Sequence, residues 1–237
     1  MDPEVYDRWY ETPRGRWIGT RESALVLAEL APRPGESLLD VGCGTGYFTR
    51  ALASATTGTV TGADVDPRRV DYARRRRDAD LSYEVADARA LPHPNRSFDL
   101  VVAITALCFV DDERRALCEM LRVARRRVAV GLLNRHSLLG WQRVRDGGRG
   151  GYRGARWHTV REAARLFDGL PAQQVRVRTA IHLPGGGRFA RFVERIWPGS
   201  FHTGAFILVV ADVARQAALS STRIESGTAG EAAASRP

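Results

Sequence analysis

The chain has 237 residues, of which 44% are apolar, and this is enough to bury a single large α/β core. Its start lacks the basic and apolar pattern of a secretory signal, and no apolar run is long enough to span a bilayer. The three cysteines show neither zinc spacing nor a disulfide framework, so we expect reduced thiols and no metal. We therefore expect a cytoplasmic protein with no membrane partner.

All 36 basic residues are arginine, and they are unevenly placed along the chain. Residues 1–100 carry 14 arginines against 16 acids, whereas residues 101–215 carry 20 arginines against 9 acids. The excess that gives the chain its formal charge of +9 therefore lies in the second half. The absence of lysine indicates a bias in the coding DNA, which accounts for much of this charge without an anionic partner.

The first predicted element is an aromatic segment at residues 6–22, which we call the leader. It reads YDRWYETPRGRWIGTRE, with Tyr6, Trp9 and Tyr10 close together at its start. From the residues alone, this pattern predicts an N-terminal helix whose aromatic side chains cap the core.

A strand followed by a glycine-rich turn comes next. Residues 37–48 read SLLDVGCGTGYF, an apolar run that ends in Asp40 and continues into glycines at alternate positions. A continuous apolar run is typical of a buried parallel strand, and glycines before a helix let the backbone approach a ligand closely. A dinucleotide-binding pattern would place its third glycine at Tyr47, so this turn is of a different kind.

Two further strands are predicted, each followed by an acid. Residues 58–64 read GTVTGAD, and Asp64 stands about twenty residues after the glycine turn, where nucleotide-binding folds place a carboxylate for ribose hydroxyls. Asp66 and Pro67 then match the N-cap and first residue of a helix that ends in an arginine run. The next strand, in LSYEVADARALP, comes just before Asp87.

The later elements continue the alternation of strands and helices. SFDLVVAITALCFV predicts a fourth strand whose ligand-facing end is at residues 104–106. An amphipathic helix follows, then a loop at residues 124–127 and a fifth strand that ends near His136. GAFILVVADVA, at residues 204–214, predicts the last strand.

These motifs, in this order, resemble those of the class I S-adenosylmethionine-dependent methyltransferases, in the small-molecule branch called methyltransferase type 11. The resemblance implies an α/β, doubly wound, Rossmann-like seven-stranded sheet with helices on both faces, over residues 1–214. Residues 215–237 are rich in Ser, Ala, Gly and Thr, so we expect them to form a disordered tail. At residues 124–127, relatives commonly carry a proline-glycine turn that this chain lacks.

The resemblance also implies a binding site for S-adenosyl-L-methionine. Asp64 is expected to bind the ribose hydroxyls, Asp87 to accept from the adenine amino group, and the amide of Ala88 to meet the ring. The small side chain of Cys43 suits a close approach of the ligand. The residues expected to bind the cofactor are Asp40, Gly42, Cys43, Gly44, Thr45, Gly46, Asp64, Val65, Asp87, Ala88, Ile104, Thr105 and Ala106.

In the same branch, an aromatic N-terminal segment folds over the bound cofactor. Tyr6, Trp9, Tyr10 and Gly15 are the matching positions in this chain. The leader therefore has two interpretations: a cover for the cofactor, or a helix that only caps the core.

The arginine-rich segment from Asn134 to Arg165 also has two interpretations. It holds eight arginines together with Trp141, Tyr152, Trp157 and a glycine-rich stretch at residues 147–151. Basic residues mixed with aromatic ones can bind single-stranded RNA, but the same mixture can form a flexible lid over a small anionic or aromatic substrate. We favour the lid, because no appended RNA-binding domain is present, and we expect no nucleic-acid partner.

Methyl transfer needs little chemistry from the protein, because the sulfonium of the cofactor already makes the methyl group electrophilic. Where the acceptor must lose a proton, Tyr10 and His136 are the candidate catalytic residues. Each has a structural alternative, since Tyr10 could only cover the cofactor and His136 could only satisfy a loop hydrogen bond. His158 precedes a capping box formed by Thr159 and Glu162, which predicts a loop residue at a helix start.

The sequence thus favours an enzyme that transfers a methyl group from S-adenosyl-L-methionine to a small molecule. Two alternatives stay open: an RNA methyltransferase, and a non-catalytic binding or regulatory protein on the same fold. The three cysteines, Cys43, Cys108 and Cys118, are expected to be small buried side chains, and a soft-metal site formed by them is the alternative. The residues identify neither the methyl acceptor nor the oligomeric state.

Overall fold

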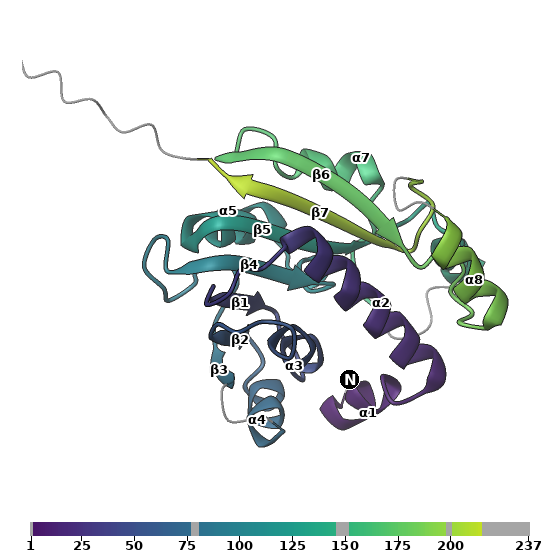
Figure 1. The fold of residues 1–237 in the computed structure, drawn as a ribbon, viewed down its shortest axis with the longest axis horizontal. Helices are drawn as coiled ribbons and strands as arrows, with labels where there is room; N and C mark the ends of the chain where they lie inside the picture. Colours follow the sequence, from purple (N-terminus) through teal and green to yellow (C-terminus); the bar gives the residue numbers. More distant parts are fainter. Residues whose placement is uncertain (1, 77–80, 146–151, 198–200, 215–237) are drawn as a thin grey trace, which may run out of the picture.

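The computed structural model describes residues 2–76, 81–145, 152–197 and 201–214, which form a seven-stranded sheet with helices on both faces (Figure 1). The expected tail at residues 215–237 and the glycine-rich stretch at residues 147–151 lie outside the described residues. The strands are β1 (Leu38–Val41), β2 (Val60–Asp64), β3 (Leu81–Val85), β4 (Phe98–Ile104), β5 (Ala124–Leu133), β6 (Ala172–Ala180) and β7 (Phe206–Val213). The helices are α1 (Pro3–Trp9), α2 (Pro13–Leu30), α3 (Tyr47–Ala53), α4 (Pro67–Arg75), the short 3₁₀ helix η1 (Leu107–Phe109), α5 (Glu113–Val123), α6 (Leu138–Arg145), α7 (Val160–Arg165) and α8 (Arg188–Ile196).

The strand order is β3-β2-β1-β4-β5-β7-β6. Neighbouring strands from β3 to β5 are parallel, while β7 runs antiparallel to both β5 and β6. The order reverses between β1 and β4, and open α/β sheets bind ligands at such a point, beyond the carboxyl ends of the strands. The predicted doubly wound sheet is confirmed, and its topology places a ligand site after β1 and β4.

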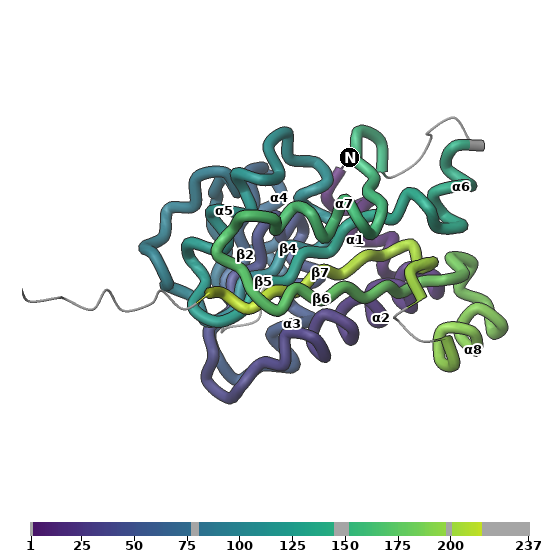
Figure 2. The backbone as a smooth tube through the Cα atoms, turned by 90° about the horizontal axis from the view of Figure 1, so that it is seen from above, coloured from purple at the N-terminus to yellow at the C-terminus, as the bar shows by residue number. Residues whose placement is uncertain are grey.

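Alternating side chains of the strands supply two cores, one on each face of the sheet. In β4, Val101 and Ala103 pack in the core that contains α5 and α7, while Leu100 and Val102 pack in the core that contains α2, α3 and α4. Figure 2 shows α5 and α7 on one side of the strands and α2 and α3 on the other. All four β4 side chains are fully buried, as expected for a parallel strand covered on both faces.

The helix starts read from the sequence are confirmed in α4 and α7. Asp66 caps α4, because its Oδ1 accepts a hydrogen bond from the amide of Arg68 at 3.0 Å, and Pro67 is the first helical residue. Thr159 and Glu162 form the predicted capping box of α7. These caps depend only on residues within one helical turn, so the sequence pattern was sufficient to locate them.

The expectation of a loop at residues 124–127 is wrong. Helix α5 ends at Val123, and β5 begins at the next residue, Ala124, whose φ of −81° and ψ of 141° are those of a strand. Within this stretch, Arg126 binds Glu36 and Arg127 binds Asp212, each with an N–O distance of 2.6 Å. These ion pairs with distant parts of the chain hold both arginines in the strand, so the sheet continues where a turn was expected.

Candidate active site

A cavity of about 570 Å³ opens at the carboxyl ends of β1, β2 and β4. Its walls include nine of the thirteen residues expected to bind the cofactor: Asp40, Gly42, Cys43, Gly44, Thr45, Asp64, Ile104, Thr105 and Ala106. The other wall residues are Tyr6, Tyr47, Phe48, Arg69, Phe109 and Arg153. The volume lies within the range of small-molecule and cofactor sites.

The glycine turn adopts a left-handed backbone conformation that other residues rarely take. The φ angles of Gly42, Gly44 and Gly46 are 73°, 56° and 78°. A Cβ atom at Gly42 would overlap the Cβ of Ala106, and one at Gly46 would overlap the ring of Tyr83. A Cβ atom at Gly44 would meet no protein atom within 4 Å. Gly46, which is not a wall residue, therefore shapes the turn, while Gly44 borders open space in the cavity.

Asp64 ends β2 with its carboxylate bound to the glycine turn. Its Oδ2 accepts from the amide of Gly44 at 2.8 Å, and its Oδ1 accepts from the amide of Asp66 at 2.9 Å. Each carboxylate oxygen can accept a second hydrogen bond, so the group keeps capacity for the hydroxyls of a ligand. Val65, the next residue, is 65% exposed and is not part of the cavity wall.

Asp40 lines the cavity but is almost completely buried. Thr49 Oγ1 donates to its Oδ2 at 2.7 Å. Burial raises the pKa of Asp40 to about 7, while the bond from Thr49 lowers the pKa and the nearby charge of Asp64 raises it. Asp40 can therefore carry a proton near neutral pH, although carboxyl groups are ordinarily ionised there.

Asp87 and Ala88 follow β3 and lie outside the cavity wall. The Asp87 carboxylate is held by Arg89, whose Nε is 3.0 Å from Oδ1 and whose Nη2 is 2.7 Å from Oδ2. These hydrogen bonds lower the pKa of Asp87. Contact between Asp87 and an adenine amino group stays a prediction, and it requires Arg89 to share or release the carboxylate.

The leader covers one side of the cavity. Tyr6 is a wall residue, and the hydroxyl oxygens of Tyr6 and Tyr10 are 3.1 Å apart. The buried ring of Tyr10 stacks on the wall residue Tyr47, with ring centroids 3.8 Å apart. Trp9 packs edge-on against Tyr10, and a Cβ atom at Gly15 would overlap the carbonyl oxygen of Trp9. The leader thus borders the cavity and also extends the core, and its role as a cover for the cofactor stays a prediction.

Asp7 is a buried acid in α1 that sequence reasoning missed. Its Oδ1 accepts from Thr45 Oγ1 at 2.8 Å and from Arg50 Nη2 at 3.2 Å, and its Oδ2 pairs with Arg76. One carboxylate therefore joins α1 to the glycine turn, to α3 and to the end of α4. The available signal was an acid placed among the aromatic residues of the leader.

Glu22, on α2, is a second buried acid that sequence reasoning missed. It has no hydrogen-bond or ion-pair partner in the part of the chain that the structure describes, and burial raises its pKa to about 8. Burial also raises the pKa of Tyr6, Tyr10 and Tyr47, and the charge of Glu22 adds to each of these shifts. The charge of Glu22 thus acts on these tyrosines, although Glu22 itself is not a wall residue of the cavity.

The two histidines singled out in the sequence lie elsewhere. His136 is exposed in the turn after β5, outside the cavity wall, and its backbone amide donates to Asn134 Oδ1 at 3.0 Å. His158 is a loop residue before α7, as predicted, but it is buried, with its Nε2 3.0 Å from Glu113 Oε2. The structure thus brings Tyr10, but not His136, to the side of the cavity.

The cysteines do not converge. Burial raises the pKa of Cys43 and raises that of Cys108 to about 12, while Cys118 is exposed. Among the described residues, which include all three cysteines, no group of three or more His, Cys, Asp or Glu side chains is placed to hold a metal ion. The arrangement fits separate thiols rather than a shared ligand set.

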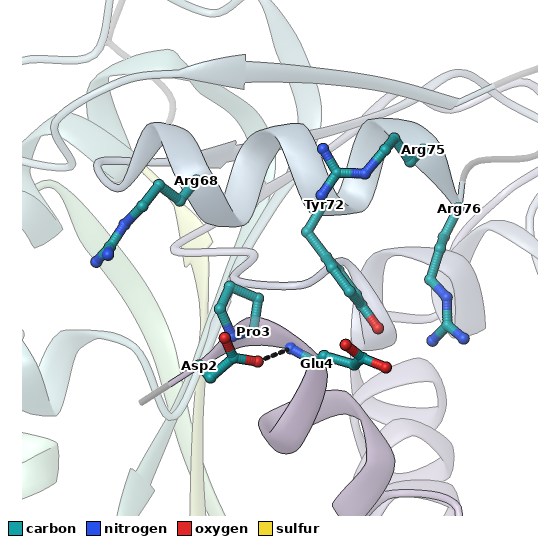
Figure 3. A pocket seen from close by; sticks show the side chains of 7 residues that line it. All are labelled: Asp2, Pro3, Glu4, Arg68, Tyr72, Arg75 and Arg76. Atoms are coloured by element: carbon teal, nitrogen blue, oxygen red, sulfur yellow. Dashed lines mark hydrogen bonds between the residues drawn. The ribbon is translucent and has the colours of Figure 1, made fainter.

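A second cavity, of about 720 Å³, lies between α1 and α4 (Figure 3). Its walls are Asp2, Pro3, Glu4, Arg68, Tyr72, Arg75 and Arg76, none of which the sequence assigned to a site. In Figure 3, Arg68 and Arg76 lie at opposite ends of α4, so the positive charges do not converge on one point. We therefore place the candidate site in the smaller cavity, beside the glycine turn.

Comparisons with known proteins identify a family for part of the chain. A family model described as a methyltransferase domain matches residues 39–130. An O-methyltransferase of Pyrenophora dematioidea is 38% identical over 105 residues, which are 42% of this chain and 39% of that protein. The matching region thus spans well under half of that relative.

Two further similarities extend over nearly the whole chain. An uncharacterized protein of Mycobacterium bovis is 32% identical over 225 residues, which are 89% of this chain and 72% of that protein. The crystal structure of a SAM-dependent methyltransferase, possible histamine N-methyltransferase, from Thermotoga maritima has the same fold, with a TM-score of 0.69 and 23% identity over 89% of this chain and 95% of that one. The methyltransferase-domain match over residues 39–130 makes the chain a member of the methyltransferases, and its glycine turn and strand order give it the fold of the class I S-adenosylmethionine-dependent enzymes.

Proposed function

We propose that the protein binds S-adenosyl-L-methionine in the cavity beside the glycine turn and transfers its methyl group to a small-molecule acceptor. The observation that carries the proposal is the cavity wall, which joins Gly44, Asp64 and residues 104–106 from three neighbouring strand ends. The similarity to a protein named an O-methyltransferase supports a hydroxyl oxygen as the acceptor atom.

The residues of the cavity suit this cofactor. Gly44 leaves room for a ligand to approach the backbone, and Asp64 keeps lone pairs for ribose hydroxyls. Thr105, at the end of β4, has a φ of 49°, a strained conformation for a β-branched residue that is typical of functional sites. When bound, the cofactor supplies a methyl group made electrophilic by its sulfonium, so the protein has to position the acceptor and exclude water.

The wall residues that are not expected to bind the cofactor are the candidates for contact with the acceptor. Phe109 follows β4 and Arg153 belongs to the arginine-rich segment, and both line the cavity. An aromatic face and a guanidinium favour an aromatic or anionic acceptor. Tyr6 and Tyr10 of the leader would cover the acceptor and limit the access of water.

A hydroxyl acceptor must also lose a proton. The raised pKa of the Tyr10 phenol keeps it protonated near neutral pH, so Tyr10 is a poor base. A carboxyl with a pKa of about 8, as at Glu22, is better matched to proton transfer near neutral pH. We therefore expect Tyr10 to serve as cover, and the ionisation of Glu22, which is not a wall residue, to affect the rate only through its charge on the tyrosines.

Methyl transfer from labelled cofactor tests this proposal. An extract of small metabolites and total RNA are offered separately, and the products are identified by mass spectrometry. We expect label in a small molecule, and we expect Asp64→Ala to lower transfer on the order of tenfold or more, since unpaired ribose hydroxyls cost about 1–3 kcal/mol. Asp71→Ala, which removes an exposed acid of α4, is the matched control.

The alternatives predict different outcomes. Label confined to RNA, with RNA binding that falls steeply as salt rises, would favour an RNA methyltransferase. Cofactor binding without transfer to either pool would favour a non-catalytic binding protein.

A further inference from the structure

Helix α8 turns its apolar face away from the protein. Its buried residues are Ala190 and Glu194, whereas Phe189, Phe192 and Ile196 are 72%, 58% and 57% exposed. The spacing of these three apolar residues places them on one face of the helix. A helix on the surface of a globular protein ordinarily has the reverse arrangement, with its apolar face toward the core.

Glu194 holds α8 in this orientation. Its Oε1 accepts from Arg21 Nε at 2.9 Å and from the amide of Ile181 at 3.0 Å, and its Oε2 accepts from the amide of His182 at 3.0 Å. Rotating α8 to bury its phenylalanines would withdraw the carboxylate and leave these donors unpaired, which is unfavourable. The outward apolar face is therefore a stable feature of the fold.

Arginines lie along one side of this apolar face. Arg188, Arg191 and Arg195 repeat with the same helical spacing on a neighbouring stripe, while the acid of α8, Glu194, is buried in its ion pair with Arg21. A second copy of the chain packed on this face would bring like charges together. An anionic surface would instead be complementary to it.

The exposed apolar surface extends beyond α8. Trp197 and Phe201 continue it, with ring centroids 5.3 Å apart. Clustered apolar side chains, unlike single scattered ones, mark an interaction surface.

We propose that α8 docks on the surface of an anionic lipid bilayer, with its phenylalanines in the headgroup boundary and its arginines on the lipid phosphates. An apolar face flanked by cations is typical of helices that lie in a membrane interface. No helix in the described part of the chain is long and apolar enough to cross a membrane, but a helix that lies on the surface needs no such length. The proposal thus departs from the sequence-based expectation of no membrane partner.

Flotation of the full chain with lipid vesicles tests the proposal. The probes are vesicles of phosphatidylcholine alone and of an equal mixture of phosphatidylcholine and phosphatidylglycerol, at low and high salt. We expect binding to the mixed vesicles to be on the order of tenfold or more tighter than to the neutral ones, and to weaken at high salt. The double variants Phe189→Ser with Phe192→Ser, and Arg188→Glu with Arg195→Glu, should each lose most of this binding.

Matched controls change the same residue types elsewhere. Val175→Ser alters an exposed apolar residue of β6, and Arg161→Glu with Arg165→Glu alters exposed arginines of α7. These controls should bind vesicles like the wild type, and thermal unfolding should show that every variant is folded. Absence of binding to the mixed vesicles would overturn the proposal, as would undiminished binding by the folded phenylalanine variant. Self-association that requires Phe189 and Phe192, without vesicle binding, would assign the face to a second copy instead.

Discussion

At Glu22, burial without an ion pair in the described part of the chain raises the pKa of the carboxyl group. The pKa of about 8 means that the folded protein keeps this group protonated at neutral pH, while its ordinary pKa is 4.5. Between these values the unfolded chain binds fewer protons than the folded one. The free energy of unfolding should therefore fall as the pH rises from 4.5 to about 8.

Glu22→Gln removes this ionisation. We expect the variant to match the wild type at about pH 4 and to be more stable at about pH 9, by about 1.4 kcal/mol for each unit of pKa shift. Urea unfolding at the two pH values measures the difference, and Glu11→Gln, at an exposed acid of the leader, is the control. Parallel pH dependences for the variant and the wild type would show that Glu22 is not protonated in the fold. If Glu22 controls the rate, the variant also loses the rise of kcat with pH near 8.

At the scale of elements, the leader is fastened to the rest of the fold through the Asp7 carboxylate. Asp7→Asn keeps an acceptor for Thr45 but removes the charge that binds Arg50 and Arg76. We expect faster hydrogen exchange in residues 6–19 and a cofactor affinity lower on the order of tenfold, with a smaller effect on the sheet core. Exchange monitored by mass spectrometry, with and without S-adenosylhomocysteine, measures the change in the leader.

The control for Asp7→Asn changes another acid of the same helix, α1. Glu4→Gln removes a largely exposed ion pair with Arg8, and such surface pairs contribute little. It should leave exchange in the leader and cofactor affinity unchanged. Equal exchange in Asp7→Asn and the wild type would mean that the leader is held by its aromatic packing alone.

Elements with local signals were predictable from the sequence. The glycine turn and the caps of α4 and α7 each depend on residues within a few positions of one another. The start of β5 and the orientation of α8 were not predictable, because they depend on Glu36 and Arg21, which are far away in the sequence. Propensity and periodicity cannot reveal a partner that only the folded chain brings close.

In the candidate site, too, the sequence predicted the residues at strand ends but not those buried by packing between helices. The carboxyl ends of neighbouring parallel strands lie at one edge of the sheet. Asp64, at the end of β2, and residues 104–106, at the end of β4, therefore line one cavity, as expected. Asp87 lies outside the wall, with its carboxylate on Arg89. Asp7 and Glu22 escaped prediction because their burial depends on how α1 and α2 pack over the cavity.

At the scale of the whole molecule, the positive second half of the chain is partly neutralised by the first. Arg126 binds Glu36 and Arg178 binds Glu29, so arginines of the later strands pair with acids from the first part of the chain. These arginines have a structural role, which reduces the charge available for an RNA strand. The small-molecule interpretation is the one that this distribution favours.

If the cofactor binds against the glycine turn, two glycine variants should differ in their affinity for S-adenosylhomocysteine, and calorimetric titration measures that affinity. Gly44 and Gly35 both have positive φ, of 56° and 78°, and a Cβ atom at either would meet no protein atom within 4 Å. Valine should therefore cost similar folding strain at both positions, but only position 44 borders the cavity. We predict that Gly44→Val weakens binding at least about tenfold, or about 1.4 kcal/mol, while Gly35→Val binds like the wild type. Equal affinity in the two variants would place the cofactor elsewhere.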